Sequence, residues 1–348
     1  MRKKILMAAL SVLTVCALAS CGKKDDEKKT DAPTTTAATT EAVTTEAVTT
    51  TALTTATATE ATTEEAEEEN YNTGDASLDN PRNADEIGEK EILVVSFGTS
   101  YNDSRRLTIG AIEESIEKAY PDYSVRRAFT SDIIIEHVKK RDNEVIDSLD
   151  EALERAVKNG VKELIIQPTH LMYGFEYDEI EKKIANYSDK FDKVTIGATL
   201  LGEDENFEKV AQILVDEMSK YDDGETAICF MGHGTEHESN AVYTKMQETF
   251  KNLGYENYYV GTVEATPSFQ DVIDTVKATG KYKKVVLRPL MVVAGDHANN
   301  DMAGEEEDSW KSLFVKEGFE VETVISGLGE IPAIQDIYVG AVQDSIEK

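Results

Sequence analysis

The residues after position 88 repeat one order of short apolar runs separated by amphipathic stretches, and this repeat most constrains the fold. Each copy holds four apolar runs of strand length, at 92–95, 125–129, 164–166 and 194–200, and then at 226–231, 258–263, 285–293 and 321–325. Strands regularly separated by helices predict a parallel sheet with right-handed crossovers. We therefore predict an α/β protein of two similar doubly wound halves, 88–222 and 223–348, which are related by a pseudo-twofold axis and face a central cleft.

The two copies also match residue by residue at the ends of their strands. The segment PTHLMYGFE at 168–176 matches PLMVVAGDH at 289–297, which pairs Glu176 with His297. In the same way FGT at 97–99 matches HGT at 233–235, and the segment at 125–131 matches the one at 260–266, pairing Phe129 with Glu264. Potential ligands are thus concentrated in the second copy, with apolar residues and one carboxylate in the first.

His233, Glu264 and His297 follow the first three predicted strands of the second copy. Because open α/β sheets bind ligands beyond the carboxyl ends of their strands, we expect these side chains to lie side by side. Two imidazoles and a carboxylate suit a divalent first-row metal such as Co²⁺, Ni²⁺, Fe²⁺ or Zn²⁺. The alternative is a set of polar strand ends with no shared ligand, and spacing alone leaves both open.

The first 87 residues have the pattern of an export signal and a linker. Basic residues at 2–4 precede an apolar stretch at 5–17, and Leu18-Ala19-Ser20-Cys21 resembles a bacterial lipobox. This resemblance implies cleavage before Cys21 and lipid on its sulfur; the alternative is an ordinary signal peptide with an incidental cysteine. Residues 22–87, rich in Thr, Ala and Glu, predict a disordered linker. We expect an extracytoplasmic protein anchored to the cell membrane through its lipid.

Composition and missing motifs exclude several classes of function. The formal net charge of −31 argues against a nucleic-acid partner. The three cysteines, two of them in the export signal, cannot build a disulfide framework or a thiolate metal site. Neither a G-x-G-x-x-G run nor a phosphate-binding P-loop occurs, so the sequence predicts no nucleotide cofactor.

Three motifs in these strand ends resemble one enzyme family. MGHGT at 231–235, VE at 263–264 and AGDHANNDMAG at 294–304 are similar to the signature of the anaerobic-pathway sirohydrochlorin cobaltochelatases. SFGTS at 96–100 and the segment at 167–177 match as well, and the likeness covers about residues 90–345. These are class II tetrapyrrole chelatases, which work without ATP and are structurally similar to protoporphyrin ferrochelatase.

The resemblance implies an activity and roles for particular residues. It implies insertion of a divalent metal, Co²⁺ or else Ni²⁺ or Fe²⁺, into sirohydrochlorin or a related tetrapyrrole. His233 would be the proton acceptor and a metal ligand, Glu264 and His297 would complete the metal site, and Glu176 would act from the opposite side of the cleft. The small-molecule partner is then a tetrapyrrole, and an oligomer is compatible with the sequence.

Other residues are candidates for contacts with the substrate or the metal, with an ordinary surface or core position as the alternative. Candidates for the apolar walls that stack on the macrocycle are Phe97, Phe129, Met172 and Tyr173. Candidates for binding its carboxylates, each with a solvated surface role as the alternative, are Arg105, Arg106, Arg126, Arg127 and Arg288. Among the remaining histidines, His237 is a candidate outer ligand, His170 a core or cleft-wall residue, and His137 a surface residue.

The expected location conflicts with the family's cytoplasmic pathway and leaves two hypotheses. In the first, the chelatase activity is kept and moved outside the cytoplasm. In the second, a non-catalytic extracytoplasmic lipoprotein uses the same cleft to bind a metal or haem for uptake. The full ligand set favours the enzyme, whereas the location favours binding.

Overall fold

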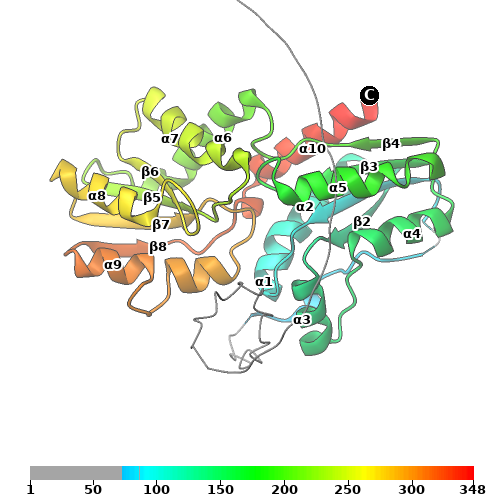
Figure 1. The fold of residues 1–348 in the computed structure, drawn as a ribbon, viewed down its shortest axis with the longest axis horizontal. Coiled ribbons are helices and arrows are strands. Elements are labelled where there is room, and N and C mark those ends of the chain that lie inside the picture. The colour runs from blue at the N-terminus through cyan, green and yellow to red at the C-terminus, as the bar shows by residue number, and fades with distance from the viewer. Residues whose placement is uncertain (1–72, 86) are drawn as a thin grey trace, which may run out of the picture. The chain divides into compact units, whose positions relative to one another are not determined.

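Two parallel sheets of four strands each, one from each copy of the repeat, form the frame of the protein in a computed structural model (Figure 1). The structure describes residues 73–85 and 87–348. The strand orders are β2-β1-β3-β4 and β6-β5-β7-β8, so the second sheet repeats the topology of the first. The predicted fold class, two similar α/β halves with parallel sheets, is confirmed.

The strands coincide with the predicted apolar runs. They are β1 (Lys90–Ser96), β2 (Ser124–Phe129), β3 (Glu163–Pro168), β4 (Lys193–Ile196), β5 (Thr226–Gly232), β6 (Tyr258–Thr262), β7 (Lys284–Pro289) and β8 (Glu320–Thr323). Two are clearly shorter than predicted: the run over 194–200 stops at Ile196, and the run over 285–293 stops at Pro289. Proline lacks the N–H that a continuing ladder needs, and the residues after it leave the sheet.

Helices connect the strands in both halves. The α-helices are α1 (Asn102–Arg105), α2 (Ala111–Ala119), α3 (Asp132–Asp142), α4 (Leu149–Asn159), α5 (Phe175–Ala185), α6 (Asp204–Met218), α7 (Ala241–Asn252), α8 (Phe269–Thr279), α9 (Trp310–Lys316) and α10 (Pro332–Glu347). The short turns, of 3-10 or, for η2 and η6, π type, are η1 (Ala76–Leu78), η2 (Arg106–Gly110), η3 (Ser188–Lys190), η4 (Ser219–Tyr221), η5 (Glu238–Asn240), η6 (Ala298–Met302) and η7 (Leu328–Glu330).

The central strands show why these sequences form sheets covered on both faces. In β1, Ile92 and Val94 join one hydrophobic cluster, whereas Leu93 and Val95 join another. Successive side chains of a strand point to opposite faces, so an unbroken apolar run buries both faces of the sheet under helices. β5 follows the same rule, with Phe230 on one face and Met231 on the other.

The two halves exchange their last helices, which the sequence did not predict. α10, at the C-terminus, packs on the first half: Tyr338 donates from its hydroxyl to the backbone oxygen of Thr169 at 2.9 Å, and Lys193 donates to the oxygen of Ile346 at 2.6 Å. α6, from the first copy, packs against α7 of the second half (Figure 1). The predicted division at 222/223 therefore separates the repeats in sequence but not the packed halves.

The predicted linker, 22–87, ends earlier than expected, because residues 73–85 belong to the folded part. The Asp79 side chain, 2% exposed, accepts from Arg105 at 2.7 Å and from Arg127 at 2.6 Å. The backbone oxygen of Arg82 accepts from the N–H of Arg127 at the edge of β2. This segment is held by ion pairs and backbone bonds rather than by apolar burial, so its polar composition resembled that of a linker.

The predicted signal segment, 1–21, and the linker up to residue 72 lie outside the described residues. Within residues 73–85 and 87–348, no helix has the length and apolar character needed to cross a membrane.

A buried carboxyl on β1 should make stability depend on pH. Glu91 is fully buried, and burial raises its pKa to about 7 against the opposing charge of Arg126, 4.0 Å away. The folded state then binds more protons than the unfolded state between pH about 4.5 and 7, so stability falls as pH rises through this window. Relative to Glu91→Gln, the wild type should lose up to about 3 kcal/mol of unfolding free energy from pH 4.5 to 8.

Urea unfolding of the wild type and of Glu91→Gln at pH 5 and pH 8 measures this difference, with the exposed Glu114→Gln as control. A gap between wild type and Glu91→Gln that is the same at both pH values would contradict the prediction.

Candidate metal centre

Three side chains predicted as ligands meet at the carboxyl edge of the second sheet. His233 directly follows β5, Glu264 lies two residues after β6, and His297 lies in the loop after β7. Each offers one ligand atom, and these atoms all lie within 4.8 Å of one another. The side chains of the three residues remain 46%, 56% and 34% exposed, in that order, so an incoming ion can reach them. The structure thus brings the predicted trio together in a group that could hold one metal ion.

Both imidazoles are held by a hydrogen bond at Nδ1. The partner of His233 is the backbone oxygen of Gly234 at 2.7 Å, and that of His297 is the carboxylate of Asp301 at 2.7 Å. Because these oxygens accept, each Nδ1 carries the hydrogen and each Nε2 keeps a free lone pair. The rings stand nearly perpendicular with centroids 4.6 Å apart. Glu264 lies 3.8 Å from Nδ1 of His233, too far for a hydrogen bond.

Glycine is required on both sides of His233. A Cβ on Gly232 would lie 2.1 Å from the ring of Tyr243, and Gly234 has φ +89°, a left-handed backbone that L side chains rarely adopt. The hydroxyl of Tyr243 accepts from the N–H of Gly234 at 3.3 Å. At the matching position of the first half, Gly98 has φ +104°. Gly98 and Gly234 let the chain turn sharply at the strand end, which exposes the side chains of the preceding residues, Phe97 and His233.

The loop that carries His297 is tied together by side chains that reach back four residues. Asn299 donates to the backbone oxygen of Gly295 at 2.7 Å, and Asn300 donates to the carboxylate of Asp296 at 2.8 Å. The Asp301–His297 contact is the third of this series, across the π turn η6. The polar run after the strand therefore builds one compact loop.

The ligand trio lies in a cleft of about 620 Å³ whose lining comes from both halves. This volume is within the range of small-molecule sites. From the first half come Glu176, at the start of α5, and the half-exposed rings of Phe97 and Phe175. Other apolar lining residues are Ile109, Ile134, Leu171, Met172, Met291, Val292 and Val293. The residues after Pro289 that leave β7 thus become part of the cleft wall.

A comparison with protein families finds a match to the cobalt chelatase (CbiK) model over residues 90–347. The chain is 36% identical over 258 residues to the sirohydrochlorin cobaltochelatase of Salmonella typhimurium, which covers 74% of this chain and 97% of that protein. The chain belongs to the cobalt chelatase family. The family and the class of enzyme predicted from the sequence, a metal–tetrapyrrole chelatase, are confirmed.

One further curated relative agrees with this assignment, and one solved structure shares the fold. Sirohydrochlorin cobaltochelatase CbiKC of Nitratidesulfovibrio vulgaris is 28% identical over 253 residues, covering 72% of this chain and 88% of that protein. The structure of SirB from Bacillus subtilis with Fe³⁺ superposes with a TM-score of 0.52 at 13% identity, over 74% of this chain and 96% of that one. At that identity, the likeness to SirB shows the fold alone.

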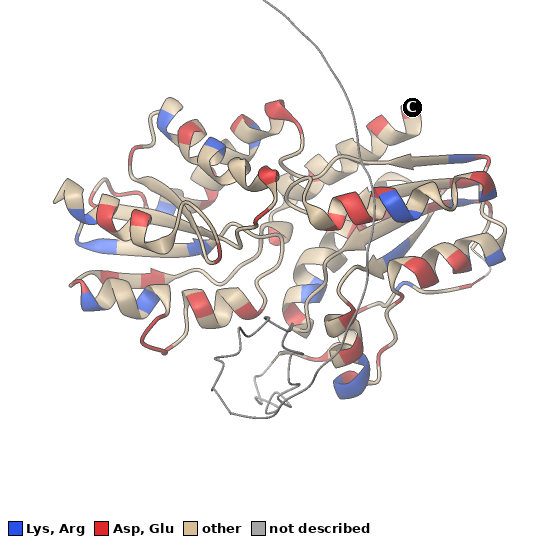
Figure 2. Ribbon diagram, in the orientation of Figure 1, with Lys and Arg blue, Asp and Glu red and all other residues tan. Residues whose placement is uncertain are grey.

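The five candidate arginines do not line the cleft of this chelatase. Arg105 and Arg127 are buried in ion pairs with Asp79, and the other three candidates each have an acidic neighbour, Asp147 for Arg126, Glu217 for Arg288 and Asp103 for Arg106. Figure 2 shows basic segments within β2 and β7, where Arg126, Arg127 and Arg288 lie. The described residues that line the cleft include four acids, Glu176, Glu236, Glu264 and Asp296, but neither lysine nor arginine.

The predicted apolar walls are right in part. Phe97 and Met172 line the cleft, but Phe129 is fully buried beneath Gly98 and cannot touch a ligand. Tyr173 does not line the cleft; it packs against Tyr177 and donates to Glu203 at 3.2 Å. Sequence reasoning missed Phe175, which directly follows Gly174, and its position next to Glu176 was the available signal.

The remaining histidines have separate places. His170 is among the residues that line the cleft, and burial lowers its pKa to about 4, so it is neutral at physiological pH. Neither of its nitrogens has a hydrogen-bond partner among the described residues, and of its two predicted roles, core or cleft wall, the structure agrees with the cleft wall. His237 contacts Ser239 at 2.9 Å and Asp178 at 3.5 Å and is not part of the ligand trio. His137 is exposed, as expected.

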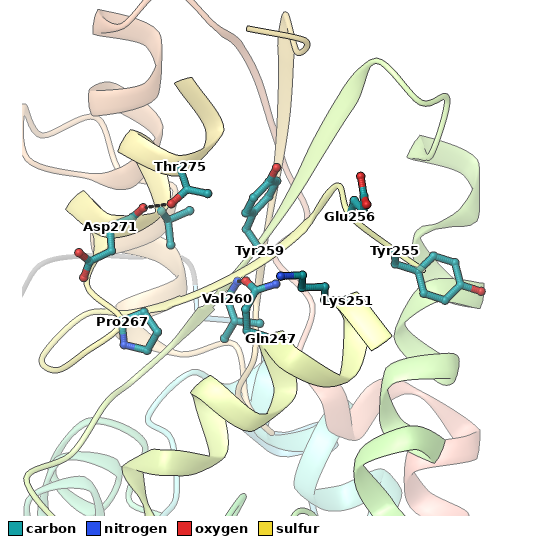
Figure 3. A pocket seen from close by; sticks show the side chains of 10 residues that line it. Gln247, Lys251, Tyr255, Glu256, Tyr259, Val260, Pro267, Asp271 and Thr275 are labelled. Atoms are coloured by element: carbon teal, nitrogen blue, oxygen red, sulfur yellow. Dashed lines mark hydrogen bonds between the residues drawn. The ribbon is translucent and has the colours of Figure 1, made fainter. Parts of the chain in front are cut away.

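A second hollow, of about 390 Å³, lies beside the edge strand β6, between α7 and α8 (Figure 3). Gln247 covers the edge of β6 there, accepting from the N–H of Val260 and donating to the oxygen of Tyr258, both at 2.9 Å. The described residues that line it include no histidine or cysteine. This hollow therefore lacks the nitrogen and sulfur ligands that a first-row transition metal prefers.

Proposed function

We propose that the protein inserts Co²⁺ into sirohydrochlorin or a closely related tetrapyrrole without ATP, with His233 as the proton acceptor. The observation that carries the proposal is the convergence of His233, Glu264 and His297 within 4.8 Å on one wall of a cleft that is otherwise largely apolar. The names of the two enzyme relatives support the same metal and macrocycle. Other divalent metals would fit the same ligands.

The chemistry accounts for the residue types. Inserting a divalent ion requires two pyrrole N–H protons to leave as the metal arrives. The free Nε2 of His233 can hold the ion and then accept a proton, because neutral imidazole does both near pH 7. Glu264, 3.8 Å from the same ring, offsets the ion's charge and can receive the proton next. Mixed nitrogen and oxygen ligation lets the ion leave, whereas thiolates would hold it more tightly.

The opposite wall suits a flat macrocycle. Phe97 and Phe175 present half-exposed rings to the cleft, and Glu176 places a carboxylate beside them. A tetrapyrrole that stacks on these rings would have its face toward the ligand trio. Among the residues that the structure describes, neither lysine nor arginine lines the cleft, so no basic side chain there would pair with the substrate's own carboxylates.

The direct test is to mix the purified protein with sirohydrochlorin and Co²⁺ and to follow the change in absorbance on metal insertion. We expect repeated turnover that is unchanged by adding ATP. A protein that only binds metal or haem for uptake would change the spectrum at most once per molecule. An insertion rate no faster than that without protein would overturn the proposed activity.

Glu264→Gln should weaken Co²⁺ binding by roughly tenfold or more. The substitution keeps the shape of the side chain but removes the charge that offsets the ion, and Glu264 is too exposed to matter for folding. Isothermal titration with Co²⁺ measures the effect. Glu236→Gln is the matched control, since Glu236 lines the same cleft outside the trio and should bind Co²⁺ like the wild type. Equal losses in both variants would argue for a diffuse charge effect instead of ligation.

We further propose that the enzyme is anchored by lipid outside the cytoplasmic membrane, on the basis of the segment ending at Cys21. Cys21→Ala should then release the protein from the membrane fraction or block its processing. Mass spectrometry of the mature N-terminus is the measurement, and finding an unlipidated Cys21 in the wild type would contradict the proposal.

A further inference from the structure

The two imidazoles of the trio have different partners, and this difference carries the inference. His233 donates from Nδ1 to the neutral backbone oxygen of Gly234, whereas His297 donates to the carboxylate of Asp301, each at 2.7 Å. Asp301 is not one of the three residues whose ligand atoms converge. Its side chain is 42% exposed, so the contact is not needed to compensate a buried charge.

A carboxylate behind an imidazole changes it as a ligand in two ways. It fixes the hydrogen on Nδ1, which keeps the lone pair of Nε2 available, and it holds the ring in one orientation. It also makes Nε2 a stronger donor to a cation, because the negative charge stabilises the polarised ring. A neutral carbonyl also fixes the hydrogen on Nδ1 and the orientation of the ring, but it strengthens Nε2 as a donor much less.

The hydrogen bond between Asp301 and His297 differs from the other side-chain hydrogen bonds of the loop. Asn299 and Asn300 make the same four-residue reach within the loop, to Gly295 and Asp296, and neither touches an imidazole. Two of these three hydrogen bonds therefore hold the loop without involving a candidate metal ligand. The third, made by Asp301, is to the candidate ligand His297.

We propose that Asp301 is a positioning residue that makes His297 the stronger imidazole ligand, leaving His233 free to exchange the ion for a proton. The proposal rests on the proposed function, because it divides the two tasks of metal insertion between two histidines. His297 would keep hold of Co²⁺ while His233, backed only by a carbonyl, releases it.

The test is Co²⁺ binding to the full chain without tetrapyrrole, by isothermal titration and by the absorption bands of bound Co²⁺. Asp301→Asn should weaken binding about 10- to 100-fold and change the spectrum. The amide introduced by Asp301→Asn can donate to Nδ1 and so move the hydrogen to Nε2, which blocks the ligand atom. Asp301→Glu should recover part of the affinity. Asn300→Ala, the matched control, should bind like the wild type.

A double-mutant cycle separates this role from a general effect on the loop. In a His297→Ala background, Asp301→Asn should change Co²⁺ affinity by less than about twofold, because the imidazole through which it acts is gone. An equal loss with and without His297, or a wild-type affinity in Asp301→Asn, would overturn the proposal.

Failure of this inference differs from failure of the proposed function. If the wild type binds Co²⁺ and the cycle shows coupling but sirohydrochlorin is not metallated, the positioning role stands and the activity fails. If cobalt is inserted but Asp301→Asn binds Co²⁺ like the wild type, the activity stands and the positioning role fails.

Discussion

His233→Ala should lower the rate of cobalt insertion at least about 100-fold, the lower end of what general acid–base catalysis contributes. In the proposed mechanism, the substitution removes both a metal ligand and the group that accepts a pyrrole proton, and the trio then keeps a single imidazole, that of His297. Binding of the tetrapyrrole should change much less, because the rings of Phe97 and Phe175 belong to the other half. The measurements are the insertion rate from absorbance and tetrapyrrole affinity from fluorescence quenching.

His137→Ala provides the control, since His137 is an exposed histidine on α3 and is not one of the three residues of the trio. It should insert cobalt at the wild-type rate. If His233→Ala is as fast as the wild type, the catalytic assignment fails even though the three ligand atoms converge. If His233→Ala loses tetrapyrrole binding to the same extent as rate, the residue acts on binding and not on proton transfer.

Asp79→Asn should destabilise the fold by about 3–5 kcal/mol, the cost of breaking a buried ion pair on one side. Asp79 is shared by Arg105 and Arg127, both fully buried, and its loss leaves their charges less compensated. Burial by itself would raise the pKa of Asp79, but the hydrogen bonds and charges of the two arginines outweigh burial and lower it. This stabilisation is therefore present above the ordinary carboxyl pKa and is lost as pH falls through the lowered one.

Urea unfolding at pH 7 and at acid pH measures this effect. Glu117→Gln is the control, because Glu117 pairs with Arg82 but is 55% exposed, and it should cost less than about 1 kcal/mol. A protein that starts at residue 88, the boundary expected from the sequence, should be destabilised at least as much as Asp79→Asn. Stability equal to the wild type in either the variant or the shortened protein would show that the buried ion pairs do not hold residues 73–85.

Much of the frame could be predicted from the sequence. Unbroken apolar runs such as Ile92–Val95 indicate strands buried on both faces, and the repeat of these runs predicts two sheets of the same topology. The trio could be predicted because it depends on a rule about strand ends: in parallel sheets, residues far apart along the chain arrive at one edge. Both predictions use local patterns and one general rule of topology.

The choice of partners could not be predicted in the same way. Arginines near strand ends were candidates for the substrate's carboxylates, yet Arg127 lies against Glu113 and Asp79 inside the protein. Phe129 is a residue type suited to a cleft wall, but its ring is buried against Gly98. Which face of a strand or loop a side chain takes depends on what the other elements leave uncovered, and residue type alone does not determine that.

By itself, then, the sequence determined the strands, their parallel arrangement and the positions of the candidate ligands His233, Glu264 and His297, because hydrophobic period and strand-end position are local properties. Only the tertiary structure decided that α6 and α10 each pack on the opposite half and that residues 73–85 belong to the fold. It also decided that Asp301 accepts a hydrogen bond from Nδ1 of His297. The physical reason is common to all three. Each of these features depends on a contact between elements or side chains, and the strength of that contact is set by the three-dimensional geometry. Such a contact produces no periodic pattern of residues in the sequence.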